Sequence, residues 1–273
     1  MVAYRDKVVL VTGASSGIGR ATALAFARRG ARLVLAARNR SELETLGAQI
    51  EQLGSQCLVA PVDVTQRDQV AAMVRAAVER FGRIDVLVNN AGVGLFASVE
   101  EMRPEQWEHV LRVNLGGAID CIQSVLPEMK RTGGGQIVNI SSVLGKRATP
   151  YMSVYSATKF ALNGFSEALR CEVADDAIDV IVVCPGRTAT PFNRNSMAQR
   201  RPLGEGGWTG MSAERCAEAI VRAAARRKRE VVLTAEGIVF VWAARWFPGL
   251  VDRAMLWVKH RSDRSASATK SGT

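Results

Sequence analysis

The 273-residue chain has little of what metal sites and disulfide frameworks require. It contains two His and five Cys, and the cysteines form no Cys-x-x-Cys pair and lie far apart, at Cys57, Cys121, Cys171, Cys184 and Cys216. A zinc site or a disulfide framework is therefore not expected, and we predict no bound metal. Unpaired cysteines of this kind fit a reducing compartment best.

A leader segment is also not expected at the start of the chain. The apolar run Lys7–Thr12 already has the composition of a strand, only a few residues after Met1. This leaves no room for a targeting peptide, so we expect a cytoplasmic protein.

Acidic residues are outnumbered, because 26 Asp and Glu against 36 Lys and Arg give a formal net charge of +10. Such an excess would suit an acidic partner, which could be a nucleic acid, an anionic membrane or an acidic carrier protein. No nucleic-acid-binding motif accompanies the charge. We therefore expect no nucleic-acid partner and favour a basic but soluble surface.

Short apolar runs alternate with longer amphipathic stretches over residues 1–235. Strands are predicted at 8–11, 33–36, 58–60, 86–88, 137–140, 180–183 and 231–233. Helices are predicted at 17–30, 40–53, 67–81, 104–131, 153–174 and 212–227. The strand segments show no alternation of apolar and polar residues, which is typical of strands covered on both faces. The pattern predicts one α/β domain with a doubly wound parallel sheet.

A glycine-rich turn, Thr12–Gly19, connects the first predicted strand to the first predicted helix. Residues without Cβ permit a tight turn and let a pyrophosphate approach the backbone. The amide groups at the start of the helix would then bind the phosphates. The turn predicts a dinucleotide site that includes Gly13, Ser15, Ser16, Gly17, Ile18 and Gly19.

Tyr155 and Lys159 lie one helical turn apart on one face of the predicted helix 153–174. A free Tyr titrates near pH 10, and a neighbouring ammonium favours the phenolate. Lowering the pKa of Tyr155 to about 7 needs roughly 4 kcal/mol, which Lys159 and a cationic nicotinamide could provide together. We expect Tyr155 to donate or remove a proton while a hydride is transferred at the neighbouring carbon.

These two motifs, Gly-x-x-x-Gly-x-Gly and Tyr-x-x-x-Lys, resemble those of the short-chain dehydrogenase/reductase family. The resemblance extends from about residue 5 to residue 192, and loosely to residue 233. It implies a single-domain Rossmann fold and NAD(P)-dependent interconversion of a carbonyl and an alcohol. It also implies that Ser142 holds the substrate oxygen, that Lys159 binds the nicotinamide ribose and that Asn114 holds a water in a proton relay.

The resemblance implies further cofactor contacts at the ends of later strands. Asp63 and Val64 would line the adenine, and the residues after the fourth strand would let the backbone approach the cofactor. The segment after the sixth strand would hold the nicotinamide carboxamide. These residues are Asn90, Ala91, Gly92, Pro185, Gly186, Thr188 and Thr190, and Thr188 stands where the family often has a branched aliphatic residue.

The end of the second strand lacks the acid that holds the ribose 2′-hydroxyl in NAD-selective sites. Ala37 stands at that position, and Arg38 follows it at once. A guanidinium suits a 2′-phosphate through its charge and its forked donors, and Arg40 and Ser15 could assist. NADP(H) is therefore the predicted cofactor, and NAD(H) is less favoured.

The substrate is indicated only by the apolar residues that we expect around it, namely Val93, Leu95, Phe96, Leu144, Met152 and Phe192. They favour a lipophilic carbonyl or alcohol, covered by a mobile loop at about 186–210. One alternative is a 3-oxoacyl-carrier-protein reductase, because an acidic carrier would suit the basic surface. Another is a regulatory protein that binds the nucleotide without turnover.

Residues 237–258 are strongly apolar, but charged residues and a proline interrupt them too often for a transmembrane helix. We predict a helical extension at 236–260 that could close the pocket, pack on a partner subunit or contact a membrane at its periphery. Residues 261–273 are rich in Ser, Ala and Thr and are predicted to be disordered. The resemblance implies a homodimer or homotetramer formed through the helices at 104–131 and 153–174.

Overall fold

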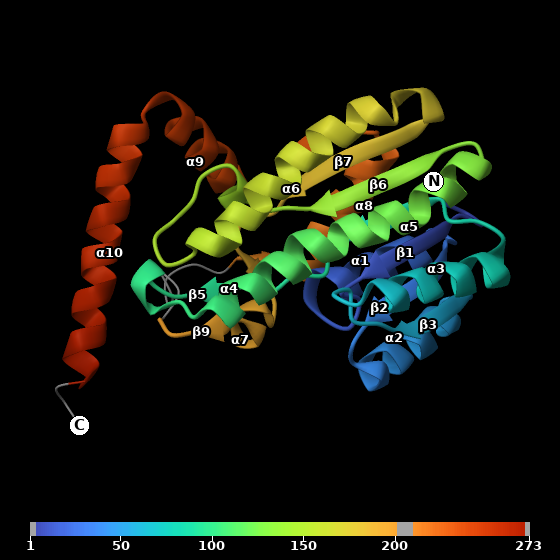
Figure 1. Ribbon diagram of the computed structural model, residues 1–273, viewed down its shortest axis with the longest axis horizontal. Coiled ribbons are helices and arrows are strands. Elements are labelled where there is room, and N and C mark those ends of the chain that lie inside the picture. The colour runs from blue at the N-terminus through green and yellow to red at the C-terminus, as the bar shows by residue number, and fades with distance from the viewer. Residues whose placement is uncertain (1–3, 201–209, 271–273) are drawn as a thin grey trace.

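A seven-stranded sheet forms the centre of the computed structural model, which describes residues 4–200 and 210–270 (Figure 1). The strand order is β3-β2-β1-β4-β6-β7-β11, and each neighbouring pair is parallel. The strands are β1 (Val8–Thr12), β2 (Arg32–Ala37), β3 (Cys57–Pro61), β4 (Val86–Asn89), β6 (Gly135–Ile140), β7 (Ile178–Cys184) and β11 (Glu230–Val232). This confirms the predicted doubly wound parallel sheet.

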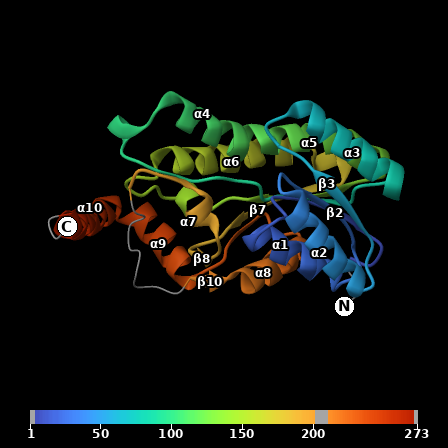
Figure 2. The same ribbon diagram turned by 90° about the horizontal axis from the view of Figure 1, so that it is seen from below.

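Helices cover both faces of the sheet (Figure 2). One layer consists of α1 (Gly17–Ala27), α2 (Arg40–Gln52) and α8 (Ala213–Ala225). The other consists of α3 (Arg67–Phe81), α5 (Gly117–Arg131) and α6 (Ser153–Glu172). Every residue of β1 and β4 is buried, which explains why the strand segments are apolar on both sides.

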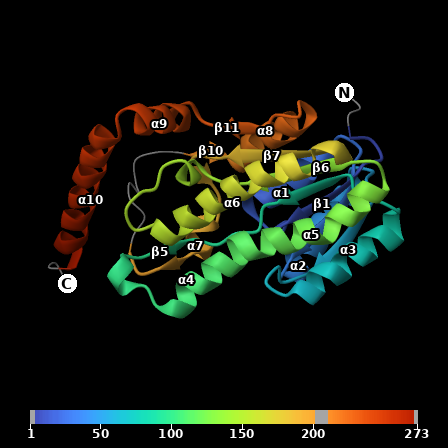
Figure 3. The ribbon, with the colours of Figure 1, turned by 45° about the horizontal axis from the view of Figure 1, so that its top comes forward.

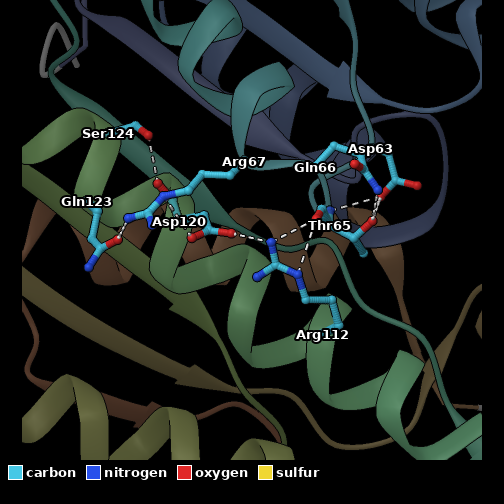
Figure 4. A network of polar contacts seen from close by, with 8 residues as sticks. All are labelled: Asp63, Thr65, Gln66, Arg67, Arg112, Asp120, Gln123 and Ser124. Carbon is cyan, nitrogen blue, oxygen red and sulfur yellow. Dashed lines mark hydrogen bonds and ion pairs between the residues drawn. The ribbon is translucent and has the colours of Figure 1, made fainter. Parts of the chain in front are cut away.

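The predicted helix at 104–131 is not continuous. It consists of α4 (Pro104–Leu111), a π-helical turn η2 (Arg112–Gly116) and α5. Figure 4 shows the polar network beside this turn, in which Arg112 Nη2 lies 2.7 Å from Asp120 Oδ2 and donates to the Thr65 carbonyl at 2.7 Å. These contacts connect the turn to the loop after β3. Such π-bulges occur frequently at functional sites.

Short elements lie beyond the carboxyl ends of the main strands (Figure 3). β5 (Leu95–Phe96) pairs with β9 (Met197–Ala198), and β8 (Thr188–Ala189) pairs with β10 (Met211–Ser212). A short helix, α7 (Phe192–Asn195), lies between β8 and β9 in the chain. The part of the predicted 186–210 loop that the structure describes therefore contains regular structure, and residues 201–209 lie outside the described residues.

The C-terminal segment forms two helices, α9 (Ala235–Trp246) and α10 (Pro248–Lys270), and α10 lies at the edge of the molecule (Figures 1 and 3). We predicted disorder from residue 261, but the structure continues α10 to Lys270, and residues 271–273 lie outside the described part. The sequence from 250 to 271 contains neither Gly nor Pro to end the helix. None of the helices in the described residues combines the length and hydropathy needed to cross a bilayer.

A chain of buried amide and hydroxyl groups links the middle of the sheet to α6. Asn89 Nδ2 donates to Asn139 Oδ1 at 2.9 Å, and Asn139 Nδ2 donates to Ser166 Oγ at 2.9 Å. Asn139 and Ser166 are fully buried. Unpaired polar groups at such positions are costly, so these hydrogen bonds fix α6 against the ends of β4 and β6.

The Asn139→Ala variant should have a free energy of unfolding lower by about 2 kcal/mol, since it removes two buried hydrogen bonds and leaves Asn89 Nδ2 and Ser166 Oγ only their bonds to the Ala118 and Leu162 carbonyls. Urea unfolding followed by circular dichroism measures this change. The control Asn193→Ala removes an exposed amide and should change the value by less than about 0.5 kcal/mol. Equal unfolding midpoints for Asn139→Ala and the wild type would contradict the stabilising role given to these hydrogen bonds.

Candidate active site

A cleft of about 1330 Å³ runs along the carboxyl ends of the strands, where β1 and β4 lie side by side and the chain crosses between the two helix layers. Ligands bind at this switch point in open α/β sheets. The volume exceeds the roughly 300–1,000 Å³ typical of a drug-sized ligand. The predicted site residues that line it are Gly13, Ser15, Ser16, Gly17, Ile18, Arg38, Asp63, Val64, Asn90, Ala91, Gly92, Ser142, Tyr155, Lys159, Pro185, Gly186, Thr188 and Thr190.

Three predicted site residues do not line the cleft. Gly19 is buried behind the turn, where an added Cβ would lie 2.2 Å from the Gly13 carbonyl oxygen. Asn114 is 1% exposed and lies behind the cleft wall. Arg40 is the first residue of α2 and is exposed, and its Nη1 lies 3.6 Å from Glu44 Oε1. Arg40 therefore extends along its own helix, so the structure does not support it as a cofactor contact.

The loops after β1 and β4 are tied together through Thr12, whose role the sequence analysis missed. The Thr12 Oγ1 accepts hydrogen bonds from the Asn90 and Ala91 amides, each at 3.0 Å, and donates to the Val88 carbonyl at 3.3 Å. Asn90 Nδ2 returns a hydrogen bond to the Thr12 carbonyl at 3.0 Å. The only available signal in the sequence was a Thr at the end of the first strand, directly before the first Gly of the turn.

The glycine turn has room and charge for a pyrophosphate. Gly13 and Gly17 have φ values of +65° and +52°, and a Cβ on Gly13 would lie 2.8 Å from Asn90 Nδ2. Ser16 caps α1 with extended backbone and, in the described structure, without a side-chain hydrogen bond to the first-turn amides. The first turn of α1 carries no acidic residue. Its free N–H groups and the helix dipole would therefore favour a bound anion.

Arg38 and Asp63 lie at the other end of the cleft, after β2 and β3. The Asp63 carboxylate accepts hydrogen bonds from the Thr65 amide at 2.9 Å and the Thr65 hydroxyl at 2.8 Å. Partial burial raises the pKa of Asp63, but these bonds and the nearby Arg38 and His109 charges outweigh it and lower the pKa below its usual value. Asp63 is therefore ionised at neutral pH.

Tyr155, Lys159 and Ser142 meet at the inner end of the cleft, and each is at least nine-tenths buried. Lys159 Nζ donates to the Ile140 carbonyl at 2.8 Å and lies 5.7 Å from the centre of the Tyr155 ring. The Leu144 amide donates to Ser142 Oγ at 3.1 Å, so Ser142 Oγ accepts there and can donate its own proton towards Tyr155. The sequence prediction that these three side chains share a site agrees with this geometry.

The expected effect of Lys159 on Tyr155 is not found in the protein alone. Burial raises the pKa of Tyr155 to about 12, and a hydrogen bond from Ser142 lowers it only in part. Burial also lowers the pKa of Lys159 to about 8. Removing both groups from water disfavours both charged forms. The predicted Tyr155 pKa near 7 requires a cationic nicotinamide in addition to Lys159, so it stays a prediction for the protein with bound cofactor.

Asn114 lies in the π-helical turn and faces the loop after β4. Its Oδ1 accepts a hydrogen bond from the Val93 amide at 2.8 Å, and its Nδ2 donates to the Val93 carbonyl at 2.9 Å and to Thr158 Oγ1 at 3.2 Å. A Cβ on Gly92 would lie 3.3 Å from Asn114 Oδ1 and 3.8 Å from Lys159 Nζ. Gly92 thus lets the Asn114 amide and the Lys159 ammonium approach the same point.

The inner walls of the cleft are mostly apolar. Val93, Phe96, Leu144, Met152 and Phe192 line it as expected. Leu95 does not, because it is buried with Ala97 and Val110 in a separate small cluster. The structure adds Met255 and Val258, which α10 contributes from the far end of the chain. Their apolar surroundings in the sequence gave a hint of such a role, but did not distinguish these two residues from their neighbours.

Two solved structures are similar to this one. An alcohol dehydrogenase from the archaeon Thermococcus sibiricus, complexed with 5-hydroxy-NADP, has a TM-score of 0.74 and 32% identity and covers 83% of this chain and 95% of its own. A short chain dehydrogenase/reductase from Burkholderia phymatum, in complex with NAD, has a TM-score of 0.82 and 26% identity and covers 92% and 96%.

Curated relatives and a family profile agree with this likeness. The 3-oxoacyl-acyl-carrier-protein reductase FabG of Thermotoga maritima is 38% identical over 208 residues, or 74% of this chain and 85% of that protein. The glycine betaine reductase ATRR of Emericella nidulans is 42% identical over 184 residues, which are 67% of this chain but 14% of that protein. The profile of the short chain dehydrogenase family matches residues 7–201. The chain therefore belongs to the short-chain dehydrogenase/reductase family and is an NAD(P)-dependent oxidoreductase.

Proposed function

We propose that this protein uses NADP(H) to interconvert a carbonyl and an alcohol on a lipophilic small molecule. The observation that carries the proposal is the buried Ser142, Tyr155 and Lys159 cluster at the inner, apolar end of the cleft. The dinucleotide would lie across the glycine turn with its adenosine end beside Arg38. When bound, the nicotinamide would supply or accept the hydride and, in its oxidised form, bring a positive charge close to Tyr155.

In reduction, Tyr155 acts as the acid. Its raised pKa keeps the phenol protonated at neutral pH, so it can donate that proton to the substrate oxygen. The Ser142 hydroxyl, which is directed towards Tyr155, would donate a second hydrogen bond to the same oxygen when substrate is bound and stabilise its developing negative charge. Lys159, with its pKa lowered to about 8, can exchange a proton near neutral pH and return one towards Tyr155.

Asn114 completes this route for the proton. Its amide and the Lys159 ammonium both lie against Gly92, and both are almost fully buried. A water bound between the Asn114 and Lys159 groups would connect the buried Lys159 with solvent. In oxidation the same groups act in reverse, so Tyr155 must first lose its proton, and the positive charge of the oxidised cofactor favours that loss.

The preference for NADP(H) rests on the residues after β2. Ala37 offers no carboxylate to a ribose 2′-hydroxyl, and Arg38 lines the cleft at that point. Arg38 is close enough to Asp63 to lower the pKa of that carboxyl, so its positive charge lies at the end of the cleft that we assign to the adenosine. A guanidinium there would bind a 2′-phosphate with charge-assisted hydrogen bonds.

A second candidate is reduction of a 3-oxoacyl group carried on an acidic carrier protein. The similarity to FabG and the net charge of +10 favour it. NADPH oxidation with acetoacetyl groups on a carrier protein, compared with free lipophilic ketones, separates the two candidates. A kcat/KM at least tenfold higher on the carrier-bound group would favour the second.

Tyr155→Phe should lower turnover by roughly 10³-fold, because it removes the proton donor but keeps the ring that packs on Phe192. NADPH oxidation with a panel of ketones measures the loss, and NADPH binding followed by calorimetry should stay within about threefold of the wild type. Tyr151→Phe is the control, because Tyr151 donates to Asp263 and does not line the cleft. Turnover that survives in Tyr155→Phe would disprove this mechanism.

Arg38→Asp should lower the ratio of kcat/KM for NADPH to that for NADH by at least about 100-fold. The substitution replaces a guanidinium that would bind the 2′-phosphate with a carboxylate that would repel it. Steady-state kinetics with both cofactors measure the ratio. Arg40→Asp is a matched control, since Arg40 pairs with Glu44 and does not line the cleft. An unchanged ratio in Arg38→Asp, or an equal change in both variants, would refute the assignment to Arg38.

A further inference from the structure

The largest group of exposed apolar side chains lies in the C-terminal helices. Of the twelve large hydrophobic residues that are exposed in the described structure, eight lie between Ile238 and Trp257. Trp242, Trp246 and Trp257 are 56%, 63% and 58% exposed. Apolar residues scattered singly over a surface need no explanation, but a group of this size marks an interaction surface.

In α9 these residues share one face of the helix. Ile238, Trp242 and Trp246 follow at intervals of four residues, and Val239 lies between them on the same side. Arg245 lies at the edge of this face and is exposed. Tryptophans are enriched at membrane–water interfaces, and a basic residue beside them suits anionic lipid headgroups.

In α10 the two sides have different partners. The inner side contributes Met255 and Val258 to the cleft. Its acidic residues are also held by the body of the protein, because Asp252 pairs with Arg147 and Asp263 accepts a hydrogen bond from Tyr151 at 2.8 Å.

The outer side of α10 combines apolar and basic residues. It exposes Leu250, Leu256 and Trp257 together with Arg253 and Arg261. The Arg261 guanidinium lies 5.5 Å from the centre of the Trp257 ring. Long basic side chains beside tryptophan can reach lipid headgroups while their stems stay in apolar surroundings.

The charge of this surface selects between a membrane and a second copy of the chain. Among the described residues, no acidic side chain forms an ion pair with Arg245 or Arg253. In a two-fold dimer the same face meets itself, so each partner would bring the same unpaired arginines to the interface. Anionic lipid instead complements both these charges and the net charge of +10.

We propose that α9 and α10 form an arm that binds the surface of an anionic lipid bilayer through Trp242, Trp246 and Trp257. Because the inner side of α10 forms part of the cleft wall, binding would hold the cleft beside the bilayer, from which lipophilic substrates could enter. This second part rests on the proposed function, whereas binding to the bilayer does not.

Co-sedimentation with vesicles tests the binding. The intact protein should bind phosphatidylcholine vesicles that contain one third phosphatidylglycerol, and bind less at high salt or with phosphatidylcholine alone. The triple variant W242S/W246S/W257S should bind at least about 100-fold more weakly, because each indole loses its apolar contact with lipid. The variant R245Q/R253Q should bind the anionic vesicles about 30-fold more weakly.

Trp107→Ser is the matched control, since Trp107 lies on α4 and is also partly exposed. It should bind vesicles as the wild type does. Thermal unfolding checks that every variant is folded, and R245Q/R253Q keeps the test valid if the triple variant is not. A wild type that binds no anionic vesicles would overturn the proposal, and so would equal binding by folded triple variant and wild type.

Turnover separates this inference from the proposed function. With NADPH and cyclohexanone in buffer, the triple variant should match the wild type within about twofold, because none of the three tryptophans lines the cleft. With dodecanal supplied in anionic vesicles, its rate should fall with its binding. A wild type that binds vesicles but reduces neither carbonyl would refute the proposed function and still support membrane binding by the arm.

A second copy of the chain is the other possible occupant of this surface. A wild type that binds no vesicles but forms a dimer that the triple variant loses would assign the surface to a second copy and refute membrane binding by the arm.

Discussion

The site depends on how closely the loops after β1 and β4 approach each other. The Thr12 hydroxyl accepts hydrogen bonds from the two amides that begin the loop after β4, those of Asn90 and Ala91. The Asn90 side chain in turn donates to the carbonyls of Thr12 and Gly13. This contact is possible only because Gly13 and Gly19 have no Cβ: a methyl group on either would overlap the Asn90 side chain. With the loops joined, the start of α1 and the backbone of Ala91 and Gly92 face the same cleft. The position of the phosphate turn relative to the loop after β4 therefore follows from one set of hydrogen bonds.

The burial of Tyr155 and Lys159 determines which direction of proton transfer these two side chains favour in the protein alone. The same lack of water that raises the pKa of Tyr155 to about 12 lowers that of Lys159 to about 8. The protein therefore holds a neutral phenol and an easily deprotonated amine, which suits proton donation in reduction. On the proposed function, removing a proton from an alcohol requires a phenolate, and the oxidised cofactor would add its positive charge to that of Lys159 beside Tyr155. The direction of proton transfer would then be linked to which cofactor form is bound.

Most of the fold and of the cofactor half of the site could be predicted from the sequence, because strands buried on both faces and glycines at a strand–helix junction leave local patterns. The π-helical turn at Arg112–Gly116 could not, because the predicted helix at 104–131 keeps a helical pattern and the turn depends on contacts of Arg112 with Thr65 and Asp120. The outward direction of Arg40 depends on its pairing with Glu44, and the pKa of Tyr155 depends on a burial that no local pattern reveals. The helical structure of residues 261–270 was missed because Ser- and Ala-rich composition indicates disorder as readily as it permits a helix.

The two halves of the cleft are built on different principles. The cofactor half consists of short loops attached directly to the ends of the main strands, so the rigid sheet fixes their backbone. The substrate half combines three segments that are distant in sequence. They are the helix α7, the inner side of α10 and the loop that precedes α6. These segments meet mainly through apolar side chains, which impose shape but few directional contacts. On the proposed function, Ser142 and Tyr155 would orient the carbonyl oxygen of the substrate, and the rest of the substrate would be selected by its fit against Phe192, Met255 and their neighbours. Changes in the C-terminal helices would therefore alter which substrate is accepted without disturbing the groups that move the proton.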